Sequence, residues 1–182
     1  MKQLGSTDLK RLHREWRRTS TSRLAIGLDS VQGPFNVGGI LRTAAAYRAE
    51  QMWLTARGTG PENPKVGKTA LGSERFFDIE RVPDGAAIIA AAKAAGYTTF
   101  AIELADQSTP IFDADLTGDV CFVLGNEDHG MSAAALQVCD AAVYIPQLGK
   151  VGSLNVSTAA AIACYEWSRQ QWRADTAAHG SR

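Results

Sequence analysis

The sequence predicts a single α/β domain in which helices cover both faces of a largely parallel β-sheet. The first observation is that short apolar runs alternate with helical patterns along most of the chain. The second is a length of 182 residues, which suits one domain with a substantial core. The third is a composition of 45% hydrophobic and 21% charged residues, which is ordinary for a globular protein.

The first half of the chain contains a helix candidate between strand candidates. Residues 23–28 form an apolar run that indicates a strand. Residues 36–48 have a helical pattern that starts at Asn36, a favourable N-cap residue. A second strand is predicted at 51–55, and a short strand or extended edge at 75–82.

The second half repeats this alternation. Residues 84–95 are alanine-rich and helical, and they end before Gly96, as helices often do. Further elements follow in order: strands at 97–104 and 119–124, a helix at 132–138, a strand at 141–145 and a helix at 155–172. Ligands of parallel α/β sheets bind beyond the carboxyl ends of the strands. The loops after Leu28, Leu124 and Ile145 are therefore candidate ligand-binding loops.

Composition excludes several classes of protein. No apolar run approaches the length of a membrane span, and the N-terminus is basic and polar rather than secretory, so we expect a cytoplasmic protein with no membrane segment. Cys121, Cys139 and Cys164 are widely spaced, which predicts buried thiols rather than a disulfide. The histidines lack metal-ligand spacing, so we expect no bound metal.

The net charge is zero, yet the charges are segregated. Residues 1–23 are rich in Lys and Arg, whereas residues 94–149 contain neither and are acidic. The segment 1–22 is therefore either a basic arm suited to phosphates or only a solvated, partly frayed terminal helix. At the other end, the polar residues 174–182 predict a disordered tail.

Residues 57–73 are rich in glycine and proline and include Lys65 and Lys68, which predicts a mobile surface loop able to contact a polyanion. Within this loop, V-G-K-T resembles the end of a phosphate-binding P-loop. The P-loop pattern requires a glycine where this chain has Glu62, and no strand leads directly into it, so we reject that interpretation.

Three segments combine glycines with polar residues near helix starts. The first, N-V-G-G-I-L-R-T-A at 36–44, places Gly38 and Gly39 inside a helix, where each costs about 1 kcal/mol and suggests close packing. Arg42 falls on the same helical face as these glycines. Taken alone, the motif is also compatible with a helix that carries an ordinary surface arginine, which is the less favoured alternative.

The second segment, V-L-G-N-E-D-H-G-M-S at 123–132, joins a buried strand to a helix through a turn that contains Glu127. The third, I-P-Q-L-G-K-V-G-S-L-N-V-S-T at 145–158, contains Gly149 and Gly152, which allow a ligand to approach the backbone. Ser153 and Asn155 then lie where the N-terminal amides of a helix need oxygen partners.

Together these segments match N-x-G-x-x-x-R, G-x-E-x-x-G and I-P-x-x-G-x-x-x-S-L-N-x-S in order and spacing. In this respect the chain resembles the SpoU (TrmH-type) branch of the SPOUT RNA methyltransferases over roughly residues 23–172. Asp128 departs from the pattern, because the family often has glycine there, and its effect on the turn is left open.

The resemblance implies a SPOUT methyltransferase domain at 23–173 with a deep C-terminal trefoil knot. It also implies a homodimer that packs the first and last helices and shares its site between subunits. S-adenosylmethionine is the implied cofactor, bound bent among the knot loops. The implied cofactor-binding residues are Ile102, Glu103, Leu124, Gly125, Asn126, Ile145, Gly149 and Leu154.

The implied reaction is methyl transfer from a sulfonium to a ribose 2′-hydroxyl, with catalytic roles for Arg42, Asn36, Ser153, Asn155 and Glu127. A guanidinium stays protonated at neutral pH and is a poor base. We therefore favour positioning and electrostatic stabilisation by Arg42, with proton abstraction as the alternative. Asn36, Ser153 and Asn155 are expected to orient Arg42 and the ribose.

The RNA substrate is not named by the sequence. We favour tRNA, because only a short basic arm precedes the expected knot domain, and rRNA is the alternative. A second alternative is a non-catalytic RNA-binding dimer that keeps the fold, against which the intact Arg42, Glu127, Ser153 and Asn155 count. A small-molecule methyltransferase is disfavoured by the basic arm.

Overall fold

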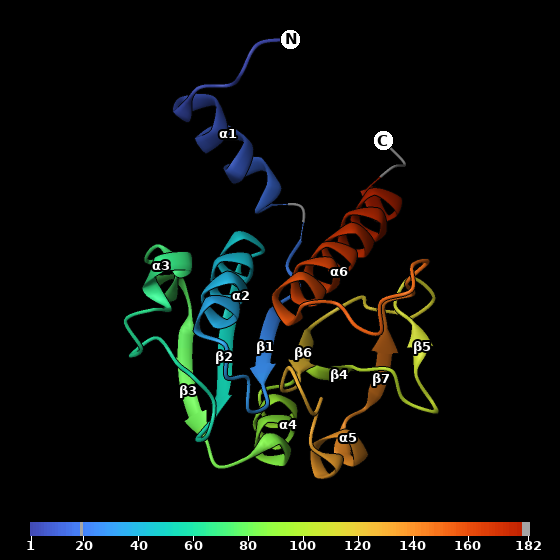
Figure 1. Cartoon of the computed structure of the whole chain (residues 1–182). Coiled ribbons are helices and arrows are strands. Elements are labelled where there is room, and N and C mark those ends of the chain that lie inside the picture. Colours follow the sequence, from blue (N-terminus) through green and yellow to red (C-terminus); the bar gives the residue numbers. More distant parts are fainter. Residues whose placement is uncertain (19, 180–182) are drawn as a thin grey trace.

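The computed structural model describes residues 1–18 and 20–179 of the chain. Its centre is a seven-stranded sheet in the order β3-β2-β1-β6-β4-β7-β5, in which every paired strand is parallel to its neighbour (Figure 1). The strands are β1 (Leu24–Leu28), β2 (Ala49–Thr55), β3 (Asp78–Val82), β4 (Thr98–Ile102), β5 (Thr109–Pro110), β6 (Val120–Leu124) and β7 (Ala141–Tyr144). The predicted parallel sheet is confirmed.

Two layers of helices cover this sheet. On one face lie α2 (Pro34–Ala46) and α6 (Val156–His179), whose apolar residues join one core cluster with the sheet. On the other face, α4 (Gly85–Ala94) and α5 (Ala133–Val138) enclose a second cluster. The central strands β1 and β6 are buried along their whole length, because both of their faces are covered.

Three further elements lie outside this sandwich. The short helix α3 (Gly67–Ala70) and the 3₁₀ turn η1 (Ser73–Phe76) pack beside α2. The helix α1 (Ser6–Trp16) has no buried residue and projects away from the body of the molecule (Figure 1). In the described part of the chain, no helix combines the length and apolarity needed to span a membrane.

Several sequence-based expectations need correction. Asn36 is not the N-cap of its helix: α2 already begins at Pro34, with Gly33 as the N-cap, because proline suits the first position of a helix. The 57–73 stretch is not wholly irregular, since it contains α3 and buries Val66 and Ala70 against the core.

The last helix differs from its expected extent as well. Asn155 precedes α6, which runs to His179 rather than ending at residue 172. The expected disordered tail, 174–182, therefore overlaps the end of this helix, and residues 180–182 lie outside the described residues.

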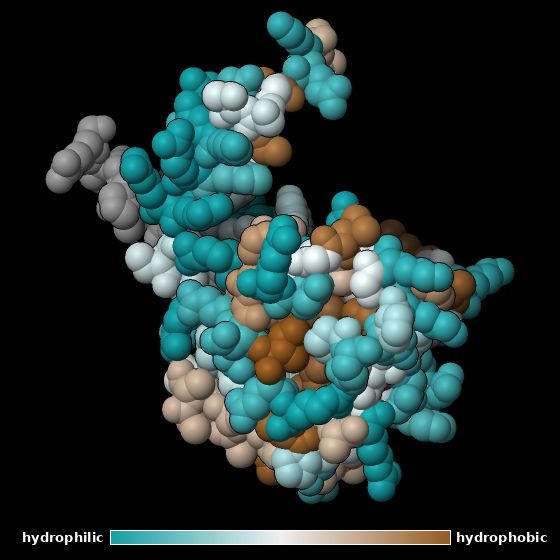
Figure 2. Space-filling view, turned by 90° about the vertical axis from the view of Figure 1, so that its left-hand side faces the viewer, coloured by the Kyte–Doolittle hydropathy of each residue, from teal (hydrophilic) through white to brown (hydrophobic). Residues whose placement is uncertain are grey.

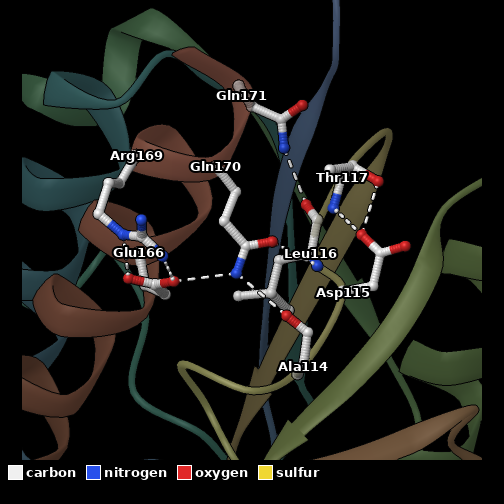
Figure 3. Close-up of polar contacts among 8 residues, drawn as sticks. All are labelled: Ala114, Asp115, Leu116, Thr117, Glu166, Arg169, Gln170 and Gln171. Carbon is white, nitrogen blue, oxygen red and sulfur yellow. Dashed lines mark hydrogen bonds and ion pairs between the residues drawn. The ribbon is translucent and has the colours of Figure 1, made fainter. Parts of the chain in front are cut away.

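Side chains of α6 also hold the backbone of the segment that leads into β6 (Figure 3). Gln170 donates to the Ala114 carbonyl (3.0 Å) and accepts from the Leu116 N–H (2.9 Å). Gln171 donates to the Leu116 carbonyl (2.8 Å) and accepts from the Gly118 N–H (3.3 Å). These bonds fix the C-terminal helix against a loop more than 50 residues earlier in the chain.

Replacing Gln171 with alanine is expected to lower the free energy of unfolding by about 2–4 kcal/mol, because two backbone groups lose their partner beside a buried side chain. Chemical denaturation would measure the change. Gln137→Ala is the matched control, because Gln137 is an exposed residue of α5, and it should shift stability by less than about 0.5 kcal/mol. Equal effects of the two substitutions would refute the anchoring role.

Candidate functional site

A cavity of about 680 Å³ opens at the carboxyl ends of β4, β6 and β7, at the edge of the sheet where ligands were expected. The candidate site residues that line it are Asn36, Ile102, Glu103, Leu124, Gly125, Asn126, Glu127, Ile145, Ser153, Leu154 and Asn155. The structure thus gathers all three glycine-containing segments around one space. Arg42 and Gly149 are not among the lining residues.

The wall after β6 is a tight turn between Asn126 and Gly130. Backbone bonds join these two residues in both directions, at 3.0 and 2.9 Å. The Asn126 side chain accepts from the N–H groups of Asp128 (3.0 Å) and His129 (3.2 Å), and it donates to the Ser30 carbonyl (2.8 Å). Asp128 is therefore accommodated, because the turn uses its backbone and leaves its side chain exposed.

Gly125 and Gly130 make this wall possible. A Cβ on Gly125 would lie 2.2 Å from both the carbonyl carbon of Gly130 and the nitrogen of Met131. Gly130 has a φ of 68°, and a Cβ there would lie 2.5 Å from a carboxylate oxygen of Glu103. Glu103 accepts from the Met131 N–H at 3.0 Å, so it holds the end of the turn. Packing within the chain therefore requires glycine at both positions, and both glycines also line the cavity.

A chain of hydrogen bonds connects the three segments across the cavity rim. Glu127 accepts from the Asn36 amide (2.9 Å) and from the backbone N–H groups of Gln32 (3.0 Å) and Gly33 (2.8 Å). The Asn36 carbonyl oxygen in turn accepts from the Asn155 amide at 2.9 Å. We call Glu127, Asn36 and Asn155 the polar relay. The Asn36–Glu127 bond joins residues 91 positions apart in the sequence, and the Asn36–Asn155 bond joins residues 119 positions apart.

The relay fixes the charge state of Glu127. Partial loss of hydration acts to raise the pKa of its carboxyl, but hydrogen bonds from Asn36 and from backbone N–H groups, those of Gln32 and Gly33 included, outweigh that effect and lower the pKa. Glu127 is therefore ionised at neutral pH and accepts hydrogen bonds only. It is suited to organising the rim rather than to removing a proton from a hydroxyl near pH 7.

Asn155 serves the relay and the following helix at the same time. Its carbonyl oxygen accepts from the backbone N–H groups of Ser157 (2.9 Å) and Thr158 (3.3 Å), which caps α6 as the sequence suggested. Its amide nitrogen is left to donate to Asn36. Ser153 is exposed at the rim and makes no hydrogen bond within the described chain, so its hydroxyl can face a ligand.

Arg42 lies apart from the relay. It is exposed on α2, and its side chain forms no hydrogen bond or ion pair with another described residue. Six residues separate it from Asn36, which places the two side chains on different sides of the helix. Within one chain, none of Asn36, Ser153 and Asn155 therefore orients Arg42, contrary to expectation. Its catalytic role stays a prediction.

The two glycines of the 145–158 segment differ in their surroundings. A Cβ on either Gly149 or Gly152 would meet open space, and neither has a positive φ, so the chain's own packing does not demand glycine at either position. Only Gly152 lines the cavity. The predicted room for a ligand is thus available beside Gly152.

The cavity also contains residues that the motifs did not single out. Tyr144, Gln147 and His129 line it, and Tyr144 is the last residue of β7. Only the position of these residues in the sequence could have predicted that they line the cavity. Residues at the carboxyl end of a parallel strand lie at the edge of the sheet where ligands bind.

The charge of the cavity restricts its ligand. Its lining includes the acidic residues Glu103, Glu127 and Asp128, and no Lys or Arg. The lining also has an apolar part, which includes the side chains of Ile102, Leu124, Ile145 and Leu154. Such a space favours a ligand with apolar or aromatic parts and positive charge over a polyanion. Among the described residues, no group of three or more His, Cys, Asp or Glu side chains could hold a metal ion.

Comparison with known proteins gives a consistent result. The model of the SpoU rRNA Methylase family matches residues 23–165. A protein of Synechocystis named as an uncharacterized tRNA/rRNA methyltransferase is 36% identical over 84% of the chain, but the chain spans only 39% of its length. The tRNA (guanosine(18)-2′-O)-methyltransferase of Thermus thermophilus is 33% identical, over 83% of the chain and 77% of that protein.

Solved structures agree with the sequence matches. The crystal structure of the SpoU methyltransferase AviRb from Streptomyces viridochromogenes, in complex with the cofactor AdoMet, superposes with a TM-score of 0.74. It is 30% identical in sequence, and the match covers 82% of this chain and 61% of that one.

Proposed function

The chain belongs to the SpoU rRNA Methylase family, and on that premise we propose that it transfers a methyl group from S-adenosylmethionine to the 2′-hydroxyl of a ribose in RNA. We favour tRNA as the substrate, with rRNA as the alternative. The observation that carries the proposal is the cavity in which the three motifs meet, with its acidic and apolar lining.

The residues present fit the cofactor. S-adenosylmethionine carries its reactive methyl on a positively charged sulfur, which an acidic cavity without Lys or Arg accommodates. Ile102, Leu124, Ile145 and Leu154 offer apolar surface for the adenosine, and the backbone at Gly125 lies beside it. The acidic residues repel the phosphates of RNA, so the polyanion is kept to the rim.

The rim then positions the substrate. The polar relay holds Asn36 and Asn155 in fixed orientations, and the Ser153 hydroxyl is free to contact the ribose. Arg42 would hold a phosphate or the developing alkoxide by charge-assisted hydrogen bonds. The hydroxyl proton leaves as the new carbon–oxygen bond forms, and alignment of the two reacting groups supplies much of the rate enhancement.

We further propose a homodimer and a C-terminal trefoil knot, both of which the resemblance of the sequence motifs implies. Arg42 has no partner among the described residues, which supports a site completed by a second subunit. The exposed Tyr165 on α6 and the unburied α1 supply surface for such an interface.

Nucleoside mass spectrometry tests this proposal. The protein is incubated with S-adenosylmethionine and either total tRNA or rRNA lacking modifications, and the RNA is digested to nucleosides. We expect a single 2′-O-methyl nucleoside, formed in tRNA. Methylation of a base would contradict the proposal, and methylation of rRNA alone would select the alternative substrate. Calorimetry with S-adenosylmethionine separates an enzyme from a non-catalytic RNA-binding protein.

A further inference from the structure

Exposed apolar side chains gather outside the cavity, where α2 begins and α3 and η1 pack beside it. Phe35, Leu71 and Phe76 are 54%, 64% and 63% exposed, values that leave most of each side chain in water. Figure 2 shows the corresponding side of the molecule, the one that carries α3 and β3, with an apolar patch ringed by hydrophilic side chains. Packing of the hydrophobic core does not account for apolar side chains at these three exposed positions.

Leu71 is also held in a backbone conformation that leucine disfavours. Its φ of 52° and ψ of 38° are left-handed, and Gly72 follows with a φ of 80°. A left-handed conformation costs an ordinary residue about 1–2 kcal/mol, and glycine would avoid the cost. Because Leu71 is 64% exposed, burial of its side chain offsets little of this cost, which points to another use for the side chain.

The surroundings of these residues are positively charged. Lys65, Lys68 and Arg75 are all exposed, and the Arg75 guanidinium lies 4.9 Å from the centre of the Phe76 ring. Glu62 is ion-paired with Arg81, and Glu74 offsets one of the three cations, so the stretch keeps a net positive charge. Asp78, at the start of β3, is the next exposed acid. We call Phe35, Leu71, Phe76, Lys65, Lys68 and Arg75 the aromatic–basic surface.

This surface is anchored rather than loose. The Thr69 hydroxyl donates to the Phe35 carbonyl at 3.2 Å, and the Ser73 hydroxyl donates to the Ala70 carbonyl at 2.6 Å. A Cβ on Gly38 would lie 2.4 Å from the Val66 carbonyl oxygen, so α2 and α3 are in close contact. A surface fixed in advance loses little entropy when it binds a partner.

The aromatic–basic surface adjoins the proposed methyl-transfer site. Phe35 directly precedes Asn36, which lines the cavity and belongs to the polar relay. The contrast in charge is sharp: the cavity has no Lys or Arg in its lining, whereas this surface carries three exposed cations. A ligand that covers both must present a neutral reacting group to the cavity and negative charge beside it.

We propose that the aromatic–basic surface binds unpaired nucleotides of the substrate RNA next to the methylated ribose. Bases stack on Phe35 and Phe76 and contact Leu71, while Lys65, Lys68 and Arg75 hold the phosphates. Aromatic faces with interleaved cations are the usual means of binding single-stranded RNA with little sequence preference. This inference rests on the proposed RNA substrate and places part of that substrate on the protein.

The test compares Phe76→Ala and Leu71→Gly with the control Phe112→Ala. Phe112 is 58% exposed and follows β5, at the edge of the sheet opposite β3. Binding of a single-stranded RNA of about 12 nucleotides, and of total tRNA, is measured by fluorescence anisotropy at several salt concentrations. Phe76→Ala is expected to weaken binding of the single strand about 10-fold, and Phe112→Ala less than about 2-fold.

Leu71→Gly separates RNA binding from stability. Glycine relieves the left-handed strain, so the melting temperature should stay equal or rise. RNA affinity should nevertheless fall about 3- to 10-fold, because the apolar contact is lost. Unchanged affinity for RNA in both Leu71→Gly and Phe76→Ala would overturn the proposal.

Two further readouts separate the possible failures. If the substitutions shift the oligomeric state measured by light scattering, the surface is an interface with a second copy of the chain and the RNA proposal is wrong. Calorimetry should show the affinity for S-adenosylmethionine unchanged. If the wild-type protein transfers no methyl group but the two substitutions still weaken RNA binding, the proposed function is wrong and the surface remains an RNA-binding surface.

Discussion

Replacing Arg42 with alanine is expected to lower the rate of methyl transfer about 10²- to 10³-fold while changing cofactor affinity less than about 2-fold. Arg42 is exposed on α2, outside the acidic cavity, and has no partner among the described residues. Its removal therefore costs the fold little. What is lost is a cation that, in the proposed dimer, a second subunit brings to the rim, where negative charge develops on the ribose oxygen or lies on a phosphate.

Single-turnover kinetics and calorimetry measure the two quantities separately. Arg42→Lys is the matched variant, because it keeps the charge but loses the planar fork of the guanidinium. Positioning by a cation predicts partial activity in Arg42→Lys and a pH–rate profile of unchanged shape. Proton abstraction by Arg42 predicts instead that the rise of the rate with pH is lost in Arg42→Ala and moves to lower pH in Arg42→Lys, because an ammonium group has a lower pKa than a guanidinium. Full activity of the Arg42→Ala variant would contradict the catalytic role of Arg42.

The fold was predictable because its signals are local. Each buried strand is a short apolar run, and the runs at β1 and β6 are buried over their whole length. The ligand edge follows from the parallel topology alone, so the loops after β6 and β7 could be placed at the cavity before any contact was known.

Contacts between distant segments could not be predicted in the same way. A local rule made Asn36 an N-cap, but Pro34 starts the helix two residues earlier and the Asn36 amide bonds Glu127, 91 positions away. Arg23, the last residue of the Lys- and Arg-rich stretch 1–23, is ion-paired with Asp119 at 2.8 Å and lies over the Tyr97 ring. The local sequence pattern does not predict these partners, because contacts between distant segments depend on tertiary packing.

The same limit applies to the glycines. Gly38 and Gly39 were expected to mark close packing, and both do: Gly38 meets α3, and a Cβ on Gly39 would lie 3.3 Å from the Ser157 Cβ of α6. Gly125 was expected to serve the cofactor, and that role stays a prediction; the nearest atoms to its Cβ position belong to Gly130 and Met131, so packing within the chain already requires glycine there. A glycine in a motif thus indicates that another group lies close to the backbone, but it does not indicate whether that group belongs to the protein or to a ligand.

Glu127→Gln is expected to lower methyl transfer about 10- to 100-fold and to destabilise the protein by about 1–3 kcal/mol. The carboxylate accepts from Asn36 and from the N–H groups of Gln32 and Gly33. A glutamine of the same shape turns an N–H₂ group towards one of these donors, which loses a hydrogen bond and frees Asn36. Because Asn36 orients Asn155, the disturbance reaches the third motif.

The pH dependence of stability provides an independent measurement. The pKa of Glu127 is lowered in the folded protein, chiefly because its hydrogen bonds outweigh the loss of hydration. Its contribution to stability is therefore fully present above the unfolded pKa, about 4.3, and is lost as the pH falls through the lower, folded value. The difference in unfolding free energy between wild type and Glu127→Gln should thus be constant near neutral pH and shrink in acid.

Asp128→Asn is the control for this prediction, since Asp128 is the adjacent turn carboxylate and its side chain is exposed outside the relay. It should change activity less than about 3-fold and leave the acid dependence of stability intact. Similar losses in both variants would mean that the turn needs only negative charge, and would contradict the polar relay.

Mixing the two loss-of-function chains joins both predictions. If the active site is shared between subunits, a dimer of one Arg42→Ala chain and one Glu127→Gln chain contains one site with both native residues. Such mixtures should regain activity that neither parent shows. If every site uses Arg42 and Glu127 of one chain, mixing restores nothing, and Arg42 would have to reach the rim of its own cavity by a movement of α2.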